Sequence, residues 1–263
     1  MKTKIQSYLP GDHPWQNHIH WFDTIDSTNT RLKEMARQGA PHGTVLIADS
    51  QTGGRGRLGR SFQSLGGMGV YMSVLLRYAA PPEDLMHLTC AVAVAACEAI
   101  NKSTCLTPGI KWTNDLVHDK RKLAGILTEL VLLPGETAAV VGIGVNCCQT
   151  VSDFDPAIQG FAGSLAMVTK KTVDRAQIAA QLILAFSQMD KDLFSCKDAI
   201  MECYEANCIT VGKDISLVRG EEIRHGHATG IDRDGALIVR FPDGHSESVS
   251  SGEVSVRGMY GYV

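Results

Sequence analysis

A glycine- and arginine-rich segment carries the clearest chemistry in this sequence. Residues 53–60, here called the glycine-arginine loop, contain four glycines and three arginines. Glycine lets a ligand approach the backbone closely, and arginine keeps its charge and can grip an oxyanion through two parallel donors. The segment has few packing residues, so we expect it to order only around a ligand. The pattern predicts a phosphate- or carboxylate-binding loop; a solvated surface loop and an RNA-binding element are the alternatives.

A second candidate combines Lys111, Asn114 and Asp115 with Lys122. A turn at residues 118–120 would form a hairpin that brings the two lysines together. Ammonium groups suit phosphates, and amide and carboxylate oxygens suit Mg²⁺. The arrangement favours a nucleoside triphosphate with its magnesium, with an ordinary surface hairpin as the alternative.

Two shorter motifs could line the same site. Residues 142–146 read Gly-Ile-Gly-Val-Asn, which leaves room for a flat ligand at the end of a strand, and Asn146 could hydrogen-bond a base edge. Residues 26–29 read Asp-Ser-Thr-Asn, which is typical of a helix start whose hydroxyl and amide groups can also bind a polar ligand. The glycine-arginine loop lacks the Gly-Lys-Ser/Thr of a Walker loop, and residues 142–146 lack the third glycine of a dinucleotide fingerprint.

Strands and helices that would position these motifs follow from apolar periodicity. The predicted strands are 19–22, 45–48, 70–76, 109–112, 123–132 and 138–145, and the predicted helices run from about 26 to 37, from 81 to 99 and from 174 to 193. The first twenty residues are expected to form a loose arm. Beyond residue 208, short apolar runs separated by turns predict a small all-β module. We therefore expect an α+β fold with a mixed β-sheet flanked by helices in residues 1–205 and a small β-barrel in residues 206–263.

Composition narrows the functional classes. The 263 residues are 44% hydrophobic and 20% charged, with a net charge of −3, which fits a globular protein and argues against broad nucleic-acid binding. No apolar run reaches the roughly 18 residues of a membrane helix, and residues 1–16 lack the apolar core of a signal peptide. Eight cysteines without a Cys-x-x-Cys motif suggest reduced thiols. We expect a cytoplasmic protein without a membrane partner.

These motifs, in this order, resemble those of the biotin–protein ligases. The matching segments are 26–29, 51–60, 111–115, 121–127 and 142–146, and the likeness extends from residue 19 to residue 263. The resemblance implies a class II synthetase-like catalytic domain with an SH3-like C-terminal barrel. It also implies a two-step reaction, in which biotin and MgATP form biotinyl-5′-AMP and the biotin then passes to a lysine of the biotin carboxyl carrier domain of a carboxylase. Lipoate ligases share the general fold but lack the glycine-arginine loop.

The resemblance also assigns roles to residues. The implied catalytic residues are Arg55, Arg57, Lys111 and Lys122. The implied biotin-binding residues are Ser27, Thr28, Asn29, Gln51, Gly54, Arg55, Gly56, Arg57, Lys122 and Gly125, with Phe62 as a cover. The implied ATP-binding residues are Arg57, Arg60, Lys111, Asn114 and Asn146, and Asp115 is the implied ligand of the magnesium that accompanies ATP. The first nucleophile is already an anion, so such a site needs cations and positioning rather than a base.

Further expectations concern what surrounds this core. Some members of the family carry an N-terminal DNA-binding domain; here the first motif begins at Asp26, so we expect a short form without specific DNA binding. The family often has proline where this chain has Thr113, which frees one backbone N–H and would loosen the turn. Sheet edges in this fold can pair across subunits, so a homodimer is a further expectation. A biotin or nucleotide sensor that releases no pyrophosphate is the remaining alternative to an enzyme.

Overall fold

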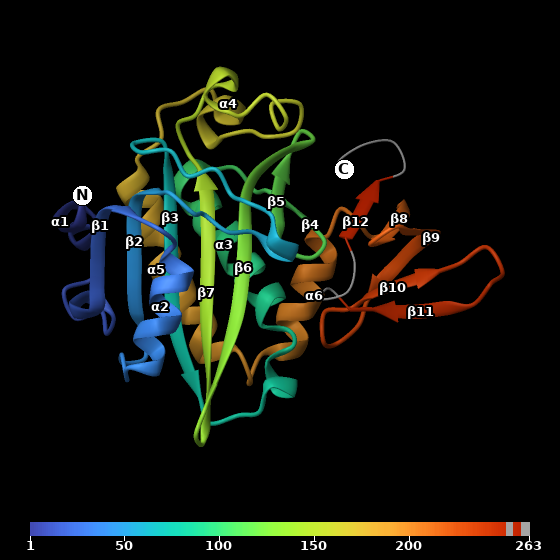
Figure 1. Cartoon of the computed structure of the whole chain (residues 1–263), viewed down its shortest axis with the longest axis horizontal. Coiled ribbons are helices and arrows are strands. Elements are labelled where there is room, and N and C mark those ends of the chain that lie inside the picture. Colours follow the sequence, from blue (N-terminus) through green and yellow to red (C-terminus); the bar gives the residue numbers. More distant parts are fainter. Residues whose placement is uncertain (251–254, 259–263) are drawn as a thin grey trace.

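A mixed β-sheet forms the centre of the chain in a computed structural model that describes residues 1–250 and the strand backbone of residues 255–258 (Figure 1). The sheet has the strand order β1-β2-β3-β7-β6-β5-β4; β1 and β2 are parallel, and the other neighbours are antiparallel. Its strands are β1 Ile19–Ile25, β2 Thr44–Gln51, β3 Gly69–Tyr78, β4 Gly109–Lys111, β5 Asp115–His118, β6 Arg121–Leu133 and β7 Glu136–Asn146. All six strands predicted for this part are present, with β5 added between them.

Helices cover the two faces of the sheet unequally. Helices α3 (Leu88–Thr104) and α5 (Arg175–Asp192) pack against each other and against one face, where they bury the larger core. Helix α2 (Thr28–Arg37), whose N-cap Ser27 accepts a hydrogen bond from the Thr30 amide, packs on the opposite face. The remaining helices are α1 Lys2–Ser7, α4 Leu165–Thr169 and α6 Lys197–Asn207, and the 3₁₀ turns are η1 Gln16–His18, η2 Arg57–Gly59, η3 Pro82–Leu85 and η4 Val151–Asp153.

The face under α2 changes character along β7. Alternate residues of a strand share one face, and here Ala138 and Val140 pack beneath Leu32 and Ala36 of α2. The next two positions on that face are Gly142 and Gly144, beyond the start of the helix. The part of β7 that α2 leaves uncovered therefore has no side chains on this face, which creates space for a ligand.

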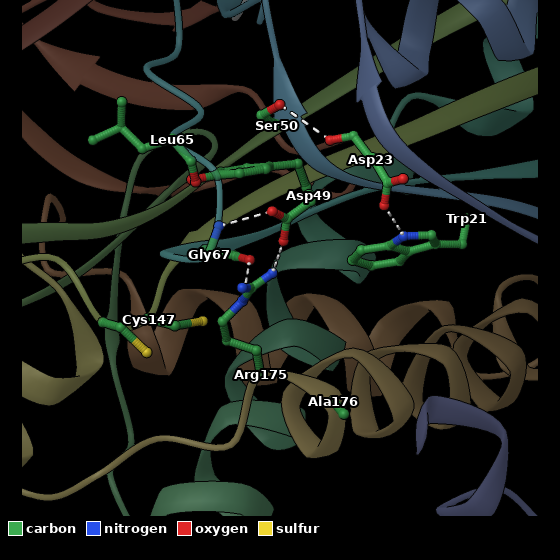
Figure 2. A network of polar contacts seen from close by, with 12 residues as sticks. Trp21, Asp23, Asp49, Ser50, Leu65, Gly67, Cys147, Arg175 and Ala176 are labelled. Atoms are coloured by element: carbon green, nitrogen blue, oxygen red, sulfur yellow. Dashed lines mark hydrogen bonds and ion pairs between the residues drawn. The ribbon is translucent and has the colours of Figure 1, made fainter. Parts of the chain in front are cut away.

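A partly buried polar network joins the strands that flank the glycine-arginine loop (Figure 2). Arg175, the first residue of α5, donates from Nε to the Gly69 carbonyl oxygen at 2.9 Å and pairs with Asp49 near the end of β2. The other carboxylate oxygen of Asp49 accepts a hydrogen bond from the Gly67 amide at 3.0 Å. Both ends of the segment between β2 and β3 are thereby tied to α5.

The C-terminal part forms a second, smaller sheet with the order β11-β10-β9-β8-β12. All its pairings are antiparallel. The strands are β8 Asp214–Arg219, β9 Glu222–Ile231, β10 Leu237–Arg240, β11 Ser246–Val249 and β12 Ser255–Gly258. The predicted division into residues 1–205 and 206–263 stays a prediction; its boundary falls inside α6. Residues 251–254 and 259–263 of the expected barrel lie outside the described residues.

Two expectations about local structure were wrong. The first twenty residues are not a loose arm, because Ile5, Leu9 and Trp15 are buried and α1 packs against α5. The helix expected from residue 81 begins only at Leu88, because the acidic segment before it forms the separate turn η3. Within the described ranges, no helix combines the length and apolarity needed to cross a bilayer.

Candidate active site

A cavity of about 450 Å³ opens on the glycine-lined half of the sheet. It lies beneath the glycine-arginine loop and beside the start of α2. The structure brings together at this cavity most of the residues singled out in the sequence, namely Ser27, Thr28, Asn29, Gln51, Arg55, Gly56, Arg57, Arg60, Phe62, Asn114, Asp115, Lys122, Gly125 and Asn146. These residues come from β2, β5, β6, β7, α2 and the loop after β2, so the fold gathers four separate sequence motifs into one site.

The floor of the cavity is formed by glycines, and a side chain at these positions would collide with its neighbours. A Cβ atom at Gly142 would lie 2.0 Å from Asn29 Oδ1, and one at Gly144 would lie 2.5 Å from the Phe62 ring. A Cβ atom at Gly125 would approach both Lys122 and Phe62 within 3.4 Å. Two neighbouring strands thus offer flat backbone, on which the Phe62 ring lies.

A chain of hydrogen bonds orders the polar end of the cavity. Ser73 Oγ lies 2.6 Å from Asn29 Oδ1 and 2.7 Å from Thr28 Oγ1. The Thr28 amide and hydroxyl both donate to Gln51 Oε1, and the Gln51 amide donates to Ser64 Oγ at 2.9 Å. These side chains are held in fixed orientations before any ligand arrives, which is the preorganisation that selective polar recognition requires.

The end of the cavity at the β5–β6 hairpin is cationic. Arg57 and Lys122 lie there, Arg55 and Arg60 also line the cavity, and Asp115 is the one carboxylate among the described lining residues. Lys122 Nζ lies 2.6 Å from Asp115 Oδ1, across the predicted hairpin of β5 and β6. The excess of positive charge in a partly enclosed space favours a ligand with several negative charges.

Arg57 is positioned by Asn114, in the turn between β4 and β5. Its Nη1 donates to Asn114 Oδ1 at 3.1 Å, and the Asn114 amide group donates in turn to the Ile126 carbonyl oxygen at 2.7 Å. Burial lowers the pKa of the Arg57 guanidinium. Because an arginine starts from a very high pKa, it remains a cation at neutral pH. The hydrogen bond between Arg57 and Asn114 joins the glycine-arginine loop to the turn between β4 and β5.

Arg55 is held by a carboxylate that the sequence analysis missed. Its Nη1 lies 3.5 Å from Glu129 Oε1, and Glu129 also accepts hydrogen bonds from Lys33 at 2.6 Å and Asn29 at 3.0 Å. Burial alone would raise the pKa of the Glu129 carboxyl, but the hydrogen bonds from Lys33 and Asn29 outweigh burial and lower this pKa. Glu129 therefore stays ionised and links the loop to the first turns of α2.

Two predicted site residues, Lys111 and Gly54, are not among the described residues that line the cavity. Lys111 is buried at the end of β4, shortly before the lining residue Asn114 in the sequence. Gly54 shapes the loop, because a Cβ atom there would lie 2.3 Å from the Phe62 carbonyl oxygen, while the Phe62 amide donates to the Gly54 carbonyl oxygen at 2.9 Å. Asn146 lines the cavity, but its amide nitrogen donates to the Gly163 carbonyl oxygen at 3.0 Å.

One wall of the cavity comes from a segment that the sequence analysis did not single out. Phe154, Ile158, Phe161 and Ala162 contribute apolar surface. The Lys122 amide donates to the Phe161 carbonyl oxygen at 2.7 Å, which attaches the segment to the start of β6. The spacing of its two phenylalanines and the isoleucine is a weak sequence signal, because nearby proline and glycine residues also indicate an ordinary loop.

Substitution of Gly142 tests the glycine floor. We expect Gly142→Ala to lower the free energy of unfolding by about 1–3 kcal/mol, because the new methyl group displaces Asn29 and leaves buried polar groups unpaired. Gly11→Ala is the control, since a Cβ atom at Gly11 meets no atom within 4 Å. Denaturant unfolding of both variants gives the comparison, and equal stability for the two would contradict the proposed close contact.

Comparison with known proteins places this chain in a class of ligases. The model of the biotin/lipoate A/B protein ligase family matches residues 21–146, and the model of the biotin protein ligase C-terminal domain matches residues 210–257. A bifunctional ligase/repressor BirA of Bacillus subtilis is 32% identical over 229 residues, which cover 86% of this chain and 70% of that protein. The biotin–[acetyl-CoA-carboxylase] ligase of Mycobacterium tuberculosis is 31% identical over 235 residues, which cover 87% of this chain and 85% of that protein.

Solved structures agree with this placement. The biotin protein ligase of Aquifex aeolicus, solved in complex with biotin and ATP, superposes with a TM-score of 0.77 and 30% sequence identity, covering 92% of this chain and 99% of that chain. The chain therefore belongs to the biotin protein ligase family. The predicted family, the predicted fold class and the prediction of an ATP-dependent ligase are confirmed.

Proposed function

We propose that this protein joins biotin to a lysine of the biotin carboxyl carrier domain of a carboxylase, with ATP as the source of energy. The observation that carries the proposal is the cavity itself, which combines an ordered polar end, a flat glycine floor and a cationic end. A ring with hydrogen-bonding groups, an apolar chain and a carboxylate match these three parts in order. Family membership and the relatives named above support the same substrates.

In the first step, the carboxylate of biotin attacks the α-phosphorus of ATP and pyrophosphate leaves. The two reactants repel each other, so the site must neutralise charge and hold both in line. We assign this task to Arg55, Arg57 and Lys122, which line the cavity. Ser27, Thr28, Asn29 and Gln51 would bind the ureido ring, and Gly56 and Gly125 would let the ligand approach the backbone. Phe62 would then move from the glycine floor to cover the bound biotin.

The nucleotide would occupy the side of the cavity nearest the β5–β6 hairpin. Arg57, Arg60 and Asn114 are the proposed contacts of the phosphates, with Lys111 behind them, and Asn146 is the proposed contact of the adenine. Asp115 is the carboxylate that could bind the accompanying magnesium, since Mg²⁺ in nucleotide sites takes one or two carboxylates and completes its shell with phosphates and water. We propose that the ion enters with ATP; among the described residues, no group of three or more acidic, histidine or cysteine side chains could hold a metal ion.

In the second step, the amine of the acceptor lysine attacks the acyl carbon of biotinyl-5′-AMP and AMP leaves. The mixed anhydride is reactive toward water, so the closed glycine-arginine loop would protect it until the acceptor arrives. The network around Arg175 ties down both ends of that segment (Figure 2). We propose that the middle of the segment opens and closes between these fixed ends.

The direct test supplies biotin, MgATP and a purified biotin carboxyl carrier domain. We expect release of pyrophosphate and a gain of one biotinyl group on the acceptor lysine, measured by mass spectrometry. A carrier domain whose acceptor lysine is replaced by arginine is the control. Absence of both the mass gain and the pyrophosphate would reject the proposal, and biotin binding without pyrophosphate release would identify a sensor.

Three expectations about the wider biology stay predictions. They are the lack of specific DNA binding, the homodimer and the cytoplasmic location. A mobility-shift assay with operator-like DNA and a sedimentation experiment test the first two directly.

A further inference from the structure

Residues from the C-terminal part of the chain form hydrogen bonds with the turn between β4 and β5. The Tyr204 hydroxyl of α6 donates to the Thr113 carbonyl oxygen at 2.9 Å, and Thr210 Oγ1 accepts from the Trp112 amide at 3.0 Å. The Trp112 indole donates to the Gly235 carbonyl oxygen at 2.9 Å, in the turn between β9 and β10. We call Tyr204, Thr210 and Gly235 the C-terminal clamp.

The clamp is buried and closely fitted. Tyr204 and Thr210 have exposed fractions of 0% and 6%. Burial raises the pKa of the Tyr204 hydroxyl well above its usual value, so the group stays a neutral donor. A Cβ atom at Gly235 would lie 2.6 Å from Cys90 Sγ, and Gly235 has a φ of +88°, so this turn must be glycine to reach α3 so closely. Its contacts are therefore specific rather than a general apolar interface.

The other side of the same turn faces the cavity. Asn114 accepts the hydrogen bond from Arg57, and Asp115 pairs with Lys122. The clamp binds the backbone of the two residues immediately before Asn114, so a shift of that backbone would displace the partners of both cations. No clamp residue is among the described lining residues, which means that any influence on the ligand must act through the turn.

We propose that the C-terminal clamp positions the β4–β5 turn for the nucleotide, so that Tyr204 and Thr210 contribute to the first reaction step without touching the substrates. This inference rests on the proposed function, because it requires that Asn114 and Arg57 meet ATP. Tyr204 and Thr210 are positioning residues. Their removal weakens the use of ATP, while the biotin end of the cavity, built from α2, β2 and β3, keeps its geometry.

Biotin-dependent exchange of pyrophosphate into ATP tests the clamp. For Tyr204→Phe and Thr210→Val we expect the KM for MgATP to rise about tenfold, since misplacement by a fraction of an ångström is costly in a preorganised site. The KM for biotin should rise less than the KM for MgATP, because the side chains proposed for the ureido ring, Thr28 and Gln51, are held by contacts that do not involve the turn. Uniform loosening of the site would instead raise both KM values equally. Thr210→Ser keeps the accepting oxygen and should restore the parent KM.

Tyr78→Phe is the matched control, because the Tyr78 hydroxyl is also buried and donates to a carboxylate, Asp190, at 2.7 Å, far from the cavity lining. All variants are assayed well below their midpoints of thermal unfolding. If Tyr204→Phe and Thr210→Val match Tyr78→Phe, or if the KM values for biotin and ATP rise together, the clamp has no positioning role. If the parent protein itself shows no biotin-dependent exchange, the proposed function falls first.

Discussion

Replacement of Lys122 by methionine is expected to slow the formation of biotinyl-5′-AMP about 10²–10³-fold. The Lys122 ammonium lies 2.6 Å from Asp115 at the cationic end of the cavity, where charge on the reacting carboxylate and phosphate must be stabilised. Loss of one preorganised donor to a developing charge typically has this effect. Methionine keeps most of the side-chain length and apolar volume, so the glycine floor at Gly125 should be preserved. Single-turnover measurement of adenylate formation separates this chemical step from product release.

The same substitution leaves Asp115 without its ammonium partner, so lost stability must be separated from lost chemistry. Lys102→Met is the control for loss of a short lysine–carboxylate pair, because Lys102 pairs with Glu98 on α3 at the same distance of 2.6 Å and is not among the described lining residues. The free energy of unfolding of each variant is measured beside its rate. We expect Lys122→Met alone to lose the chemical step. Equal rates of adenylate formation in the two variants would remove Lys122 from the mechanism.

Local patterns predicted much of the fold and of the candidate site. Strands β2, β3, β6 and β7 are apolar runs bounded by turns, and each of the site motifs lies at or next to the end of an element that the sequence indicates. The glycine-arginine loop was recognisable because its chemistry depends on residue types that are close in sequence. The two glycines of residues 142–146 were also visible, although their close contacts with Asn29 and Phe62 were not.

Contacts between distant segments set the limit of prediction. Glu129 lies in a strand that reads as a buried apolar run, and its role depends on Lys33 and Arg55, which are more than seventy positions away. Lys111 precedes a turn whose orientation is fixed by Tyr204 and Thr210, so the sequence could not show that it would be buried outside the cavity lining. The first residues were misjudged for the same reason, since the short helix α1, with the buried Ile5, is placed by its contact with α5 and not by a local pattern.

Replacement of Arg55 by alanine is expected to reduce adenylate formation about 100-fold and to leave the fold intact. Arg55 is about half exposed, and its contact with Glu129 spans 3.5 Å, so it contributes little to stability. Glu129 keeps its shorter contacts with Lys33 and Asn29 and is not left as an unpaired charge. Because the loop would close less tightly, the variant should also release more biotinyl-5′-AMP into solution. Chromatography of free adenylate during turnover measures this leak.

Arg31→Ala is the control for Arg55→Ala, because Arg31 has a similar exposed fraction, pairs with Glu34 on α2 and is not among the described residues that line the cavity. The comparison also distinguishes the ligase from an RNA-binding protein that uses the same loop. In that case Arg55→Ala would chiefly change the affinity for RNA and the dependence of that affinity on salt, since each phosphate contact releases counterions. If Arg55→Ala forms and retains adenylate as well as Arg31→Ala does, Arg55 has no part in the ligase reaction. If Arg55→Ala alone loses adenylate formation and its RNA affinity is unchanged, Arg55 acts at the reacting carboxylate.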